Sequence, residues 1–221
     1  MEGAEFLNFK KCGIERLVVG PLDVNCYLVW DKSSRDAVLI DPGGDASEIE
    51  KEVKKEGLRV KYIVNTHGHF DHVGGNAQLK DSLGAKVAIH KSDSELLENV
   101  AHQGSSFGFD SPASPPADIF LEDGTLLKAG DIILRVIYTP GHTEGGISVY
   151  IKSEGIIFTG DSLFKDSIGR TDLPGGSFEK LADSIKKILS LGDGVVVLSG
   201  HGPKTTVGEE KRGNPFVIEI I

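Results

Sequence analysis

The stretch Thr66-His67-Gly68-His69-Phe70-Asp71-His72 decides how the rest of the sequence is interpreted. It places four possible metal ligands within six positions, directly after the apolar run 60–65, which is typical of a buried strand. A helix would point His67 and His72 to different faces, whereas a loop that leaves a strand end can turn all four side chains toward one point. Imidazole and carboxylate together suit borderline divalent metals. The stretch therefore predicts a metal site rather than a surface loop that happens to be rich in histidine.

Three later parts of the chain repeat this arrangement of an apolar strand, a small residue or glycine, and then a His or Asp. They are residues 132–138 before His142, residues 156–158 before Asp161, and residues 195–198 before His201. In layered α/β proteins, functional groups gather beyond the ends of strands. We therefore expect four strand ends to converge on one site. His90 and His102 fall outside this pattern, and we expect the first to be hydrogen-bonded and the second to be exposed.

Length and composition favour one soluble globular domain over residues 1–221, because the chain has 221 residues and is 39% hydrophobic. The net charge is −9, and acids interrupt every basic run, which argues against a nucleic-acid surface and against a nuclease. Two bound divalent cations would offset part of that negative charge. The expected partner is a small molecule rather than a nucleic acid or a membrane.

Cellular location is predicted from the first residues and from the cysteines. The segment 1–5 is acidic and lacks the basic start and apolar core of a signal peptide, and no apolar run approaches membrane-spanning length. Cys12 and Cys26 are too few for a disulfide framework or a thiolate zinc site, so both are expected to be structural thiols. These features predict a cytoplasmic protein.

The order of predicted elements is that of an α/β fold. Short β-rich runs at 14–19, 25–30 and 36–40 predict an antiparallel meander, and Asp45 with Glu48 predicts a capping box for a helix that ends near Glu56. Further predicted elements are a helix over 73–83, a strand over 86–90, a helix over 93–100, a helix over 177–190, and a helix from a capping box at Thr206 and Glu209. The alternation of strands and helices predicts layered sheets.

Residues 101–118 are rich in Ser, Pro and Gly and predict a long loop or insertion. Loops of this length often cover active sites, and the alternative is a flexible surface excursion. Phe107 and Phe109 favour a loop that covers an active site, because large aromatic side chains are not expected on a flexible surface excursion.

The motif His67-x-His69-x-Asp71-His72, followed by His142, Asp161 and His201, resembles that of the metallo-β-lactamase superfamily, and the match spans most of the chain. The resemblance implies a four-layered αβ/βα sandwich and a dinuclear metal centre. One metal would be held by three imidazoles and the other by Asp71 and two imidazoles, with Asp161 bridging. The metal ligands would thus be His67, His69, Asp71, His72, His142, Asp161 and His201, with a single-metal site as the alternative.

Within that superfamily the chain most resembles the hydroxyacylglutathione hydrolases, or glyoxalase II, and their short bacterial relatives. The resemblance is carried by Thr139-Pro140-Gly141-His142-Thr143, by Gly169-Arg170-Thr171-Asp172 and by the segment 201–206. Glyoxalase II has an additional C-terminal helical domain that helps to hold glutathione, whereas this sequence stops soon after His201. The resemblance therefore implies thioester hydrolysis and leaves the acyl group and the thiol carrier open.

The implied chemistry uses two metal ions, expected to be zinc, with iron or manganese as alternatives because mixed His and Asp ligation discriminates poorly among them. The ions would share a hydroxide that attacks the carbonyl of a thioester such as S-lactoylglutathione. Asp71 is the candidate catalytic residue, because it could orient that hydroxide or accept its proton. Arg170 is the candidate substrate-binding residue, and an internal ion pair with Asp172 is its alternative role.

A second enzyme class of the same fold is the alternative function. Persulfide dioxygenases also carry a segment like Gly169-Arg170-Thr171-Asp172 and use one iron held by two His and one Asp, here corresponding to His67, His142 and Asp161. The ligand pattern by itself does not separate the two classes. A purely structural metal site is disfavoured, because such sites are closed and usually rich in thiolates.

Overall fold

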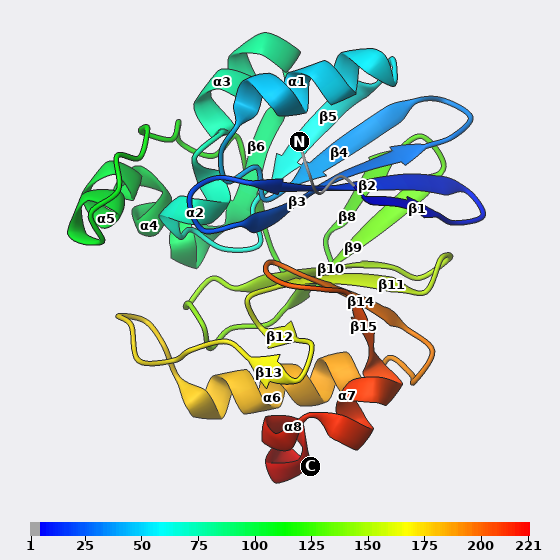
Figure 1. Cartoon of the computed structure of the whole chain (residues 1–221), viewed down its shortest axis with the longest axis vertical. Coiled ribbons are helices and arrows are strands. Elements are labelled where there is room, and N and C mark those ends of the chain that lie inside the picture. The colour runs from blue at the N-terminus through cyan, green and yellow to red at the C-terminus, as the bar shows by residue number, and fades with distance from the viewer. Residues whose placement is uncertain (1–4) are drawn as a thin grey trace.

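The computed structural model describes residues 5–221 and contains two β-sheets packed face to face, each with helices on its outer side (Figure 1). This order of helices, sheet, sheet and helices confirms the predicted αβ/βα sandwich. Residues 1–4 belong to the segment used above to argue against a signal peptide and lie outside the described residues. No helix within residues 5–221 is long and apolar enough to cross a membrane.

The first sheet has seven strands that lie side by side in chain order. Its first four strands are antiparallel neighbours, which confirms the predicted meander and adds one strand before it, and its last four are parallel neighbours. The strands are β1 (Glu5–Asn8), β2 (Cys12–Val19), β3 (Val24–Asp31), β4 (Asp36–Ile40), β5 (Arg59–Val64), β6 (Lys86–His90) and β7 (Ile119–Leu121).

The second sheet has six strands in the order β15-β14-β11-β10-β9-β8. They are β8 (Leu126–Ala129), β9 (Ile132–Tyr138), β10 (Ile147–Ile151), β11 (Ile156–Gly160), β14 (Val196–Ser199) and β15 (Thr205–Thr206), and a separate hairpin pairs β12 (Leu163–Phe164) with β13 (Ser167–Ile168). Strands β9 and β11 are both antiparallel to β10, and β11 is parallel to β14. The carboxyl ends of β9, β11 and β14 therefore lie at the same edge of the sheet.

Helices cover the outer face of each sheet (Figure 1). On the side of the first sheet are α1 (Ala46–Lys55), α2 (Phe70–Val73), α3 (Asn76–Leu83), a 3-10 turn (Lys91–Asp93), α4 (Ser94–Glu98) and α5 (Val100–Ser106). On the side of the second sheet are α6 (Phe178–Leu189), α7 (Val207–Gly213) and α8 (Pro215–Ile220). The predicted capping box of α7 is confirmed, because the Thr206 hydroxyl accepts a hydrogen bond from the Glu209 backbone N–H at 3.2 Å.

Three apolar clusters fill the three spaces between the four layers. Residues such as Val38, Val149 and Phe158 pack between the sheets, while Ile63 and Ile185 belong to the clusters beneath the two helical layers. The central strands are covered on both faces, so all eight residues of β3 and all five of β11 are buried. Strands buried on both faces read as continuous apolar runs, and this is why sequence patterning finds them.

Three local predictions differ from the structure, each for a local reason, although α1 begins after Asp45 and ends before Glu56 as predicted. The Asp45 side chain does not cap α1, because its carboxylate accepts the Gly20 backbone N–H at 2.8 Å instead. The helix expected over 73–83 is two short helices, with a break at Gly74 and Gly75. The loop expected over 101–118 is helical up to Ser106, because α5 continues from α4 after a one-residue interruption.

Candidate metal centre

The four strand ends predicted to converge do meet, at the edge where the two sheets face each other. His67 and His69 follow β5 of the first sheet, whereas His142, Asp161 and His201 follow β9, β11 and β14 of the second. A backbone hydrogen bond of 2.8 Å from the Ile147 N–H to the Thr66 carbonyl joins the two sheets beside this point. The seven predicted ligands therefore surround one point, although four different segments supply them.

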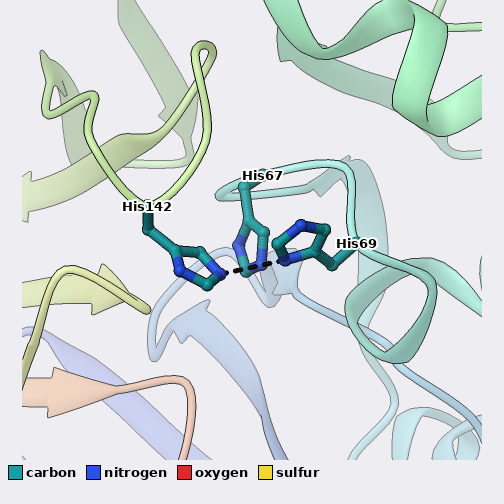
Figure 2. A group of neighbouring side chains, drawn as sticks. All are labelled: His67, His69 and His142. Atoms are coloured by element: carbon teal, nitrogen blue, oxygen red, sulfur yellow. Dashed lines mark hydrogen bonds between the residues drawn. The ribbon is translucent and has the colours of Figure 1, made fainter. Parts of the chain in front are cut away.

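A first cluster consists of His67, His69 and His142, whose candidate ligand atoms all lie within 4.8 Å of one another. Figure 2 shows the three imidazoles turned toward one another, with a hydrogen bond of 2.9 Å between His142 Nε2 and His69 Nδ1. His67 and His142 are buried. Three imidazoles in this arrangement can hold a single divalent metal ion and leave a fourth coordination position open.

A second cluster consists of Asp71, His72 and His201, again with candidate ligand atoms within 4.8 Å of one another. Helix α2 begins at Phe70 and carries Asp71 and His72 side by side. The Asp71 Oδ2 atom lies 3.6 Å from His72 Nε2 and 3.4 Å from His201 Nε2. This cluster mixes one carboxylate with two imidazoles, and His201 leaves it partly open to solvent because its side chain is 30% exposed.

Asp161 lies between the two clusters. Its Oδ1 atom is 3.4 Å from His72 Nε2, and its Oδ2 atom is 3.7 Å from His142 Nε2 and 3.6 Å from His201 Nε2. The backbone next to it must be glycine, because a Cβ atom at Gly200 would lie 2.3 Å from Asp161 Oδ1. The carboxylate therefore faces members of both clusters, as a bridging ligand would.

Three buried polar atoms at this point have no hydrogen-bond partner among the described residues, namely His67 Nε2, His72 Nε2 and Asp161 Oδ1. Leaving buried polar atoms unpaired is costly, and native proteins rarely do so without a reason. Nitrogen and carboxylate oxygen lone pairs that face a common point are what a cation would satisfy. The donor set therefore fits divalent metal.

Hydrogen bonds behind the rings fix which nitrogen faces inward. His142 Nδ1 donates to the Arg170 carbonyl at 2.8 Å, and His72 Nδ1 lies 3.1 Å from Asp41 Oδ2. The Thr66 hydroxyl donates to Asp41 at 2.7 Å, so the 3.1 Å contact between Thr66 and His67 Nδ1 has the ring as donor. In these three histidines Nδ1 is occupied as a donor and Nε2 is directed toward the centre, which is the usual second layer of a metal site, whereas His69 turns its Nδ1 toward His142.

Two buried carboxylates that support the site were missed by sequence reasoning. Asp41 directly follows β4, and it holds His72 directly and His67 through Thr66. Asp93 was read as the start of a helix. Its Oδ2 accepts the Gly68 N–H at 3.0 Å and the hydroxyl of Thr143 at 2.7 Å, and its Oδ1 accepts the Gly145 N–H at 2.6 Å.

Asp93 therefore joins the loop of His67 and His69 to the loop of His142. In the sequence, both Asp41 and Asp93 are acidic residues that follow a strand, β4 and β6 respectively. That position does not reveal which loops each carboxylate contacts. Only the contacts across the fold show it.

Electrostatics differ between the two clusters. Burial and the neighbouring imidazoles lower the pKa of His67, and burial together with His142 lowers the pKa of His69 to about 4. Burial also opposes charge on His72, but the carboxylates Asp161, Asp71 and Asp41 outweigh it and raise the pKa of His72 well above its usual value. Burial therefore favours the neutral form of His67 and His69 in the first cluster, whereas carboxylates favour the charged form of His72 in the second.

The remaining predicted residues lie as follows. Arg170 forms two hydrogen bonds to Asp172, at 2.8 and 2.6 Å, and both side chains are mostly exposed, so the predicted ion pair is present. The same arginine lines a cavity beside the metal cluster. His90 accepts the Ser92 N–H at 3.2 Å and stacks on a tyrosine, and His102 is exposed, as predicted for both.

Comparisons with known proteins agree with this geometry. The chain is 39% identical over 207 residues to the hydroxyacylglutathione hydrolase GloC of Haemophilus influenzae, which covers 92% of this chain and 97% of that protein. Its fold matches the crystal structure of the BLEG-1 B3 metallo-beta-lactamase with a TM-score of 0.87 and 40% identity, over 92% of this chain and 99% of the other. It also matches TTHA1623 in a di-iron-bound form with a TM-score of 0.85 and 38% identity, over 91% and 98%.

The sequence pattern of the metallo-beta-lactamase superfamily matches residues 19–201, a span that contains both clusters. The family match supports a metal-dependent hydrolase, and the candidate His and Asp clusters lie within the matched span. The chain belongs to the metallo-β-lactamase superfamily.

Proposed function

We propose that this protein is a thioester hydrolase that uses two divalent metal ions, with zinc as the first expectation, on substrates such as S-lactoylglutathione. The observation that carries the proposal is the pair of adjoining clusters with Asp161 between them, in which three buried polar atoms lack hydrogen-bond partners within residues 5–221. The similarity to a hydroxyacylglutathione hydrolase supports the substrate class, and the similarity to a protein solved in a di-iron form supports two ions. The proposed ligands are the six residues of the two clusters together with Asp161, seven residues in all.

Each part of the reaction has a group in place. Divalent metal held by the two clusters and Asp161 would supply a hydroxide nucleophile at neutral pH and would polarise the substrate carbonyl. The carboxylate of Asp71 lines the cavity and lies at the open side of the second cluster, where it can orient the nucleophile or accept its proton. The departing thiolate has a conjugate acid with a pKa of about 8.5, so it leaves without a dedicated general acid.

We further propose that Arg170 binds the substrate. Its guanidinium lines the cavity beside the metal cluster, while its backbone carbonyl accepts the hydrogen bond that orients His142. The exposed pair with Asp172 holds the guanidinium at this rim without burying it. A substrate carboxylate could therefore replace Asp172 as the bidentate partner.

The first experiment is thiol release from S-lactoylglutathione by the purified protein, with metals quantified on the same sample. Release with about two metal ions per chain supports the proposal. No release, with one iron per chain and oxygen uptake on glutathione persulfide, would replace it with the dioxygenase reaction.

A β-lactam substrate belongs in the same assay, because a protein named as a metallo-beta-lactamase is 40% identical to this chain. An amide nitrogen is a far poorer leaving group than a thiolate and requires a proton donor. We therefore expect thioester turnover to exceed β-lactam turnover by several orders of magnitude. The reverse order would contradict the proposed substrate class.

A further inference from the structure

A cavity of about 230 Å³ opens directly onto the candidate metal centre. Its floor consists of metal-centre side chains, namely His69, Asp71, His142 and Asp161. Its walls are largely apolar and come from separate parts of the chain, with Leu22, Phe70, Phe107, Phe109 and Leu173 as the apolar lining residues. A substrate whose reacting carbonyl meets the metal centre therefore has apolar walls around its neighbouring atoms.

The three phenylalanines form a stacked group. The Phe70 ring lies 5.8 Å from that of Phe107 and 5.6 Å from that of Phe109, with interplanar angles of 22° and 26°. Phe70 is buried at the start of α2, directly after His69, so the group is fixed to the metal-binding loop. Phe107 follows α5 and is 53% exposed at the cavity. The segment 101–118 therefore covers part of the site, the first of its two expected roles.

The polar side chains of the cavity wall are already engaged. The Gln103 amide donates to the backbone carbonyls of Gly68 and Leu96, at 3.2 and 2.6 Å. Arg170 is tied to Asp172 at the rim. No lysine is among the residues that line this cavity in the described part of the chain. The interior beyond the metal centre thus offers contact to carbon rather than to charge.

Size decides which part of a thioester this interior can hold. Sites for whole drug-sized ligands measure about 300–1,000 Å³, so 230 Å³ suits a fragment. Common thiol carriers such as glutathione are long, polar and charged, and they match the solvent-exposed rim near Arg170 better than the interior. The acyl group is the shorter part of the molecule and reaches inward from the scissile carbonyl.

We propose that this cavity selects thioesters with an apolar acyl group, which packs against Phe70, Phe107 and Phe109. The proposal rests on the thioester hydrolase function above and narrows its substrate class. A hydroxylated acyl group such as lactoyl would place a hydroxyl against the apolar wall, which is unfavourable unless the hydroxyl is hydrogen-bonded.

The test is a series of glutathione thioesters that differ only in the acyl group, namely acetyl, butyryl, hexanoyl and lactoyl, assayed with metal-loaded protein. Burial of one methylene group is worth about 0.8 kcal/mol, so we expect kcat/KM to rise about fourfold per methylene until the cavity is full. Hexanoylglutathione should be preferred to lactoylglutathione by at least about tenfold.

Two matched variants connect this preference to the cavity. Phe107→Ser should lower the ratio of hexanoyl to acetyl turnover by about tenfold. Phe120→Ser is the control, because Phe120 is equally exposed, at 52%, but lies on β7 and does not line the cavity. This control should leave the ratio unchanged.

A binding measurement separates substrate contact from chemistry. The thioether S-hexylglutathione cannot be hydrolysed, and calorimetry should show it binding more tightly than S-methylglutathione to the unaltered protein but not to Phe107→Ser. Equal binding of the two thioethers, or a flat or falling acyl series with thioester hydrolysis intact, would overturn the proposal. Failure to hydrolyse every thioester would instead overturn the proposed function.

Discussion

The two clusters of the candidate metal centre differ in charge and exposure although Asp161 adjoins both. The first consists of three imidazoles, and its loops are held together by Asp93, a carboxylate that stays outside the cluster. The second has carboxylate oxygens within the cluster itself, and its His201 is 30% exposed. The protein therefore presents a site of three imidazoles for one cation beside a site that contains carboxylate for another, and ligands of both sites line the cavity that a substrate would enter.

Removing the shared carboxylate should have the largest effect, because Asp161 faces both clusters. We expect Asp161→Ala to lower the metal content of both sites and to reduce turnover by more than the roughly 100-fold that loss of an outer partner costs. Metal analysis by mass spectrometry and the thioester assay would measure it. Asp183→Ala, at an exposed position of α6, is the control. Full activity in Asp161→Ala would show that this carboxylate does not bridge.

The carboxylates of Asp41 and Asp93, which lie outside the two clusters, should affect metal binding differently. Asp93 contacts only the loops of the first cluster, whereas Asp41 holds His72 and, through Thr66, His67. Asp93→Asn should weaken metal binding about 10-fold to 100-fold at one site, and Asp41→Asn should weaken it at both. Stepwise zinc titration of the two variants would show the difference. Identical titration curves would mean that the clusters do not behave as separate sites.

The clusters should also differ in their response to pH. The pKa of His69 is lowered to about 4 by burial and His142, so this ring has no proton to lose between pH 5.5 and 7.5. The pKa of His72 is raised by surrounding carboxylates despite its burial, so a metal must displace a proton there. Affinity at the second site should therefore rise about tenfold per pH unit while affinity at the first stays constant.

Calorimetric zinc titration at pH 6.5, in two buffers of different ionisation enthalpy, would count the displaced protons. We expect binding of one zinc ion to displace one proton and binding of the other zinc ion to displace none. The same proton count for both ions would contradict the charge difference between the clusters.

The smallest effect is expected at the rim. Arg170→Ala should raise KM about tenfold through loss of a charged hydrogen bond to substrate. It should leave the melting temperature unchanged, because the pair with Asp172 is solvent-exposed and such pairs contribute little to stability. Asp172→Ala serves as the partner control and should not raise KM. A lower melting temperature with an unaltered KM would assign Arg170 a structural role instead.

The part of the site that sequence alone predicts is the part encoded locally. Each of the proposed ligands follows a strand with an apolar run, at most eight residues after its end, and such runs are found from the sequence pattern. Parallel and like-oriented strands then bring these residues to one edge, so the convergence follows from topology.

Interactions between distant segments could not be predicted in this way. Asp45 has the spacing of a helix cap, but the Gly20 backbone lies close enough to take its carboxylate. The functions of Asp41 and Asp93 depend on which loops lie opposite them, and the stacking of Phe107 on Phe70 depends on where α5 packs. The local sequence pattern identifies the functional side chains, whereas the complete fold determines which groups they contact.

The segment that carries His201 is hydrogen-bonded to β3, which lies far from it in the sequence. Tyr27 Oη donates to the Ser199 carbonyl at 2.7 Å, and the Asn25 side chain donates to the carbonyls of Ser199 and Gly202, each at 2.9 Å. During synthesis, β3 leaves the ribosome roughly 170 residues before its hydrogen-bond partners do. The centre can therefore be assembled only after Gly202 has been made, so an emerging chain exposes its His-rich loop to cellular metals well before it can enclose them.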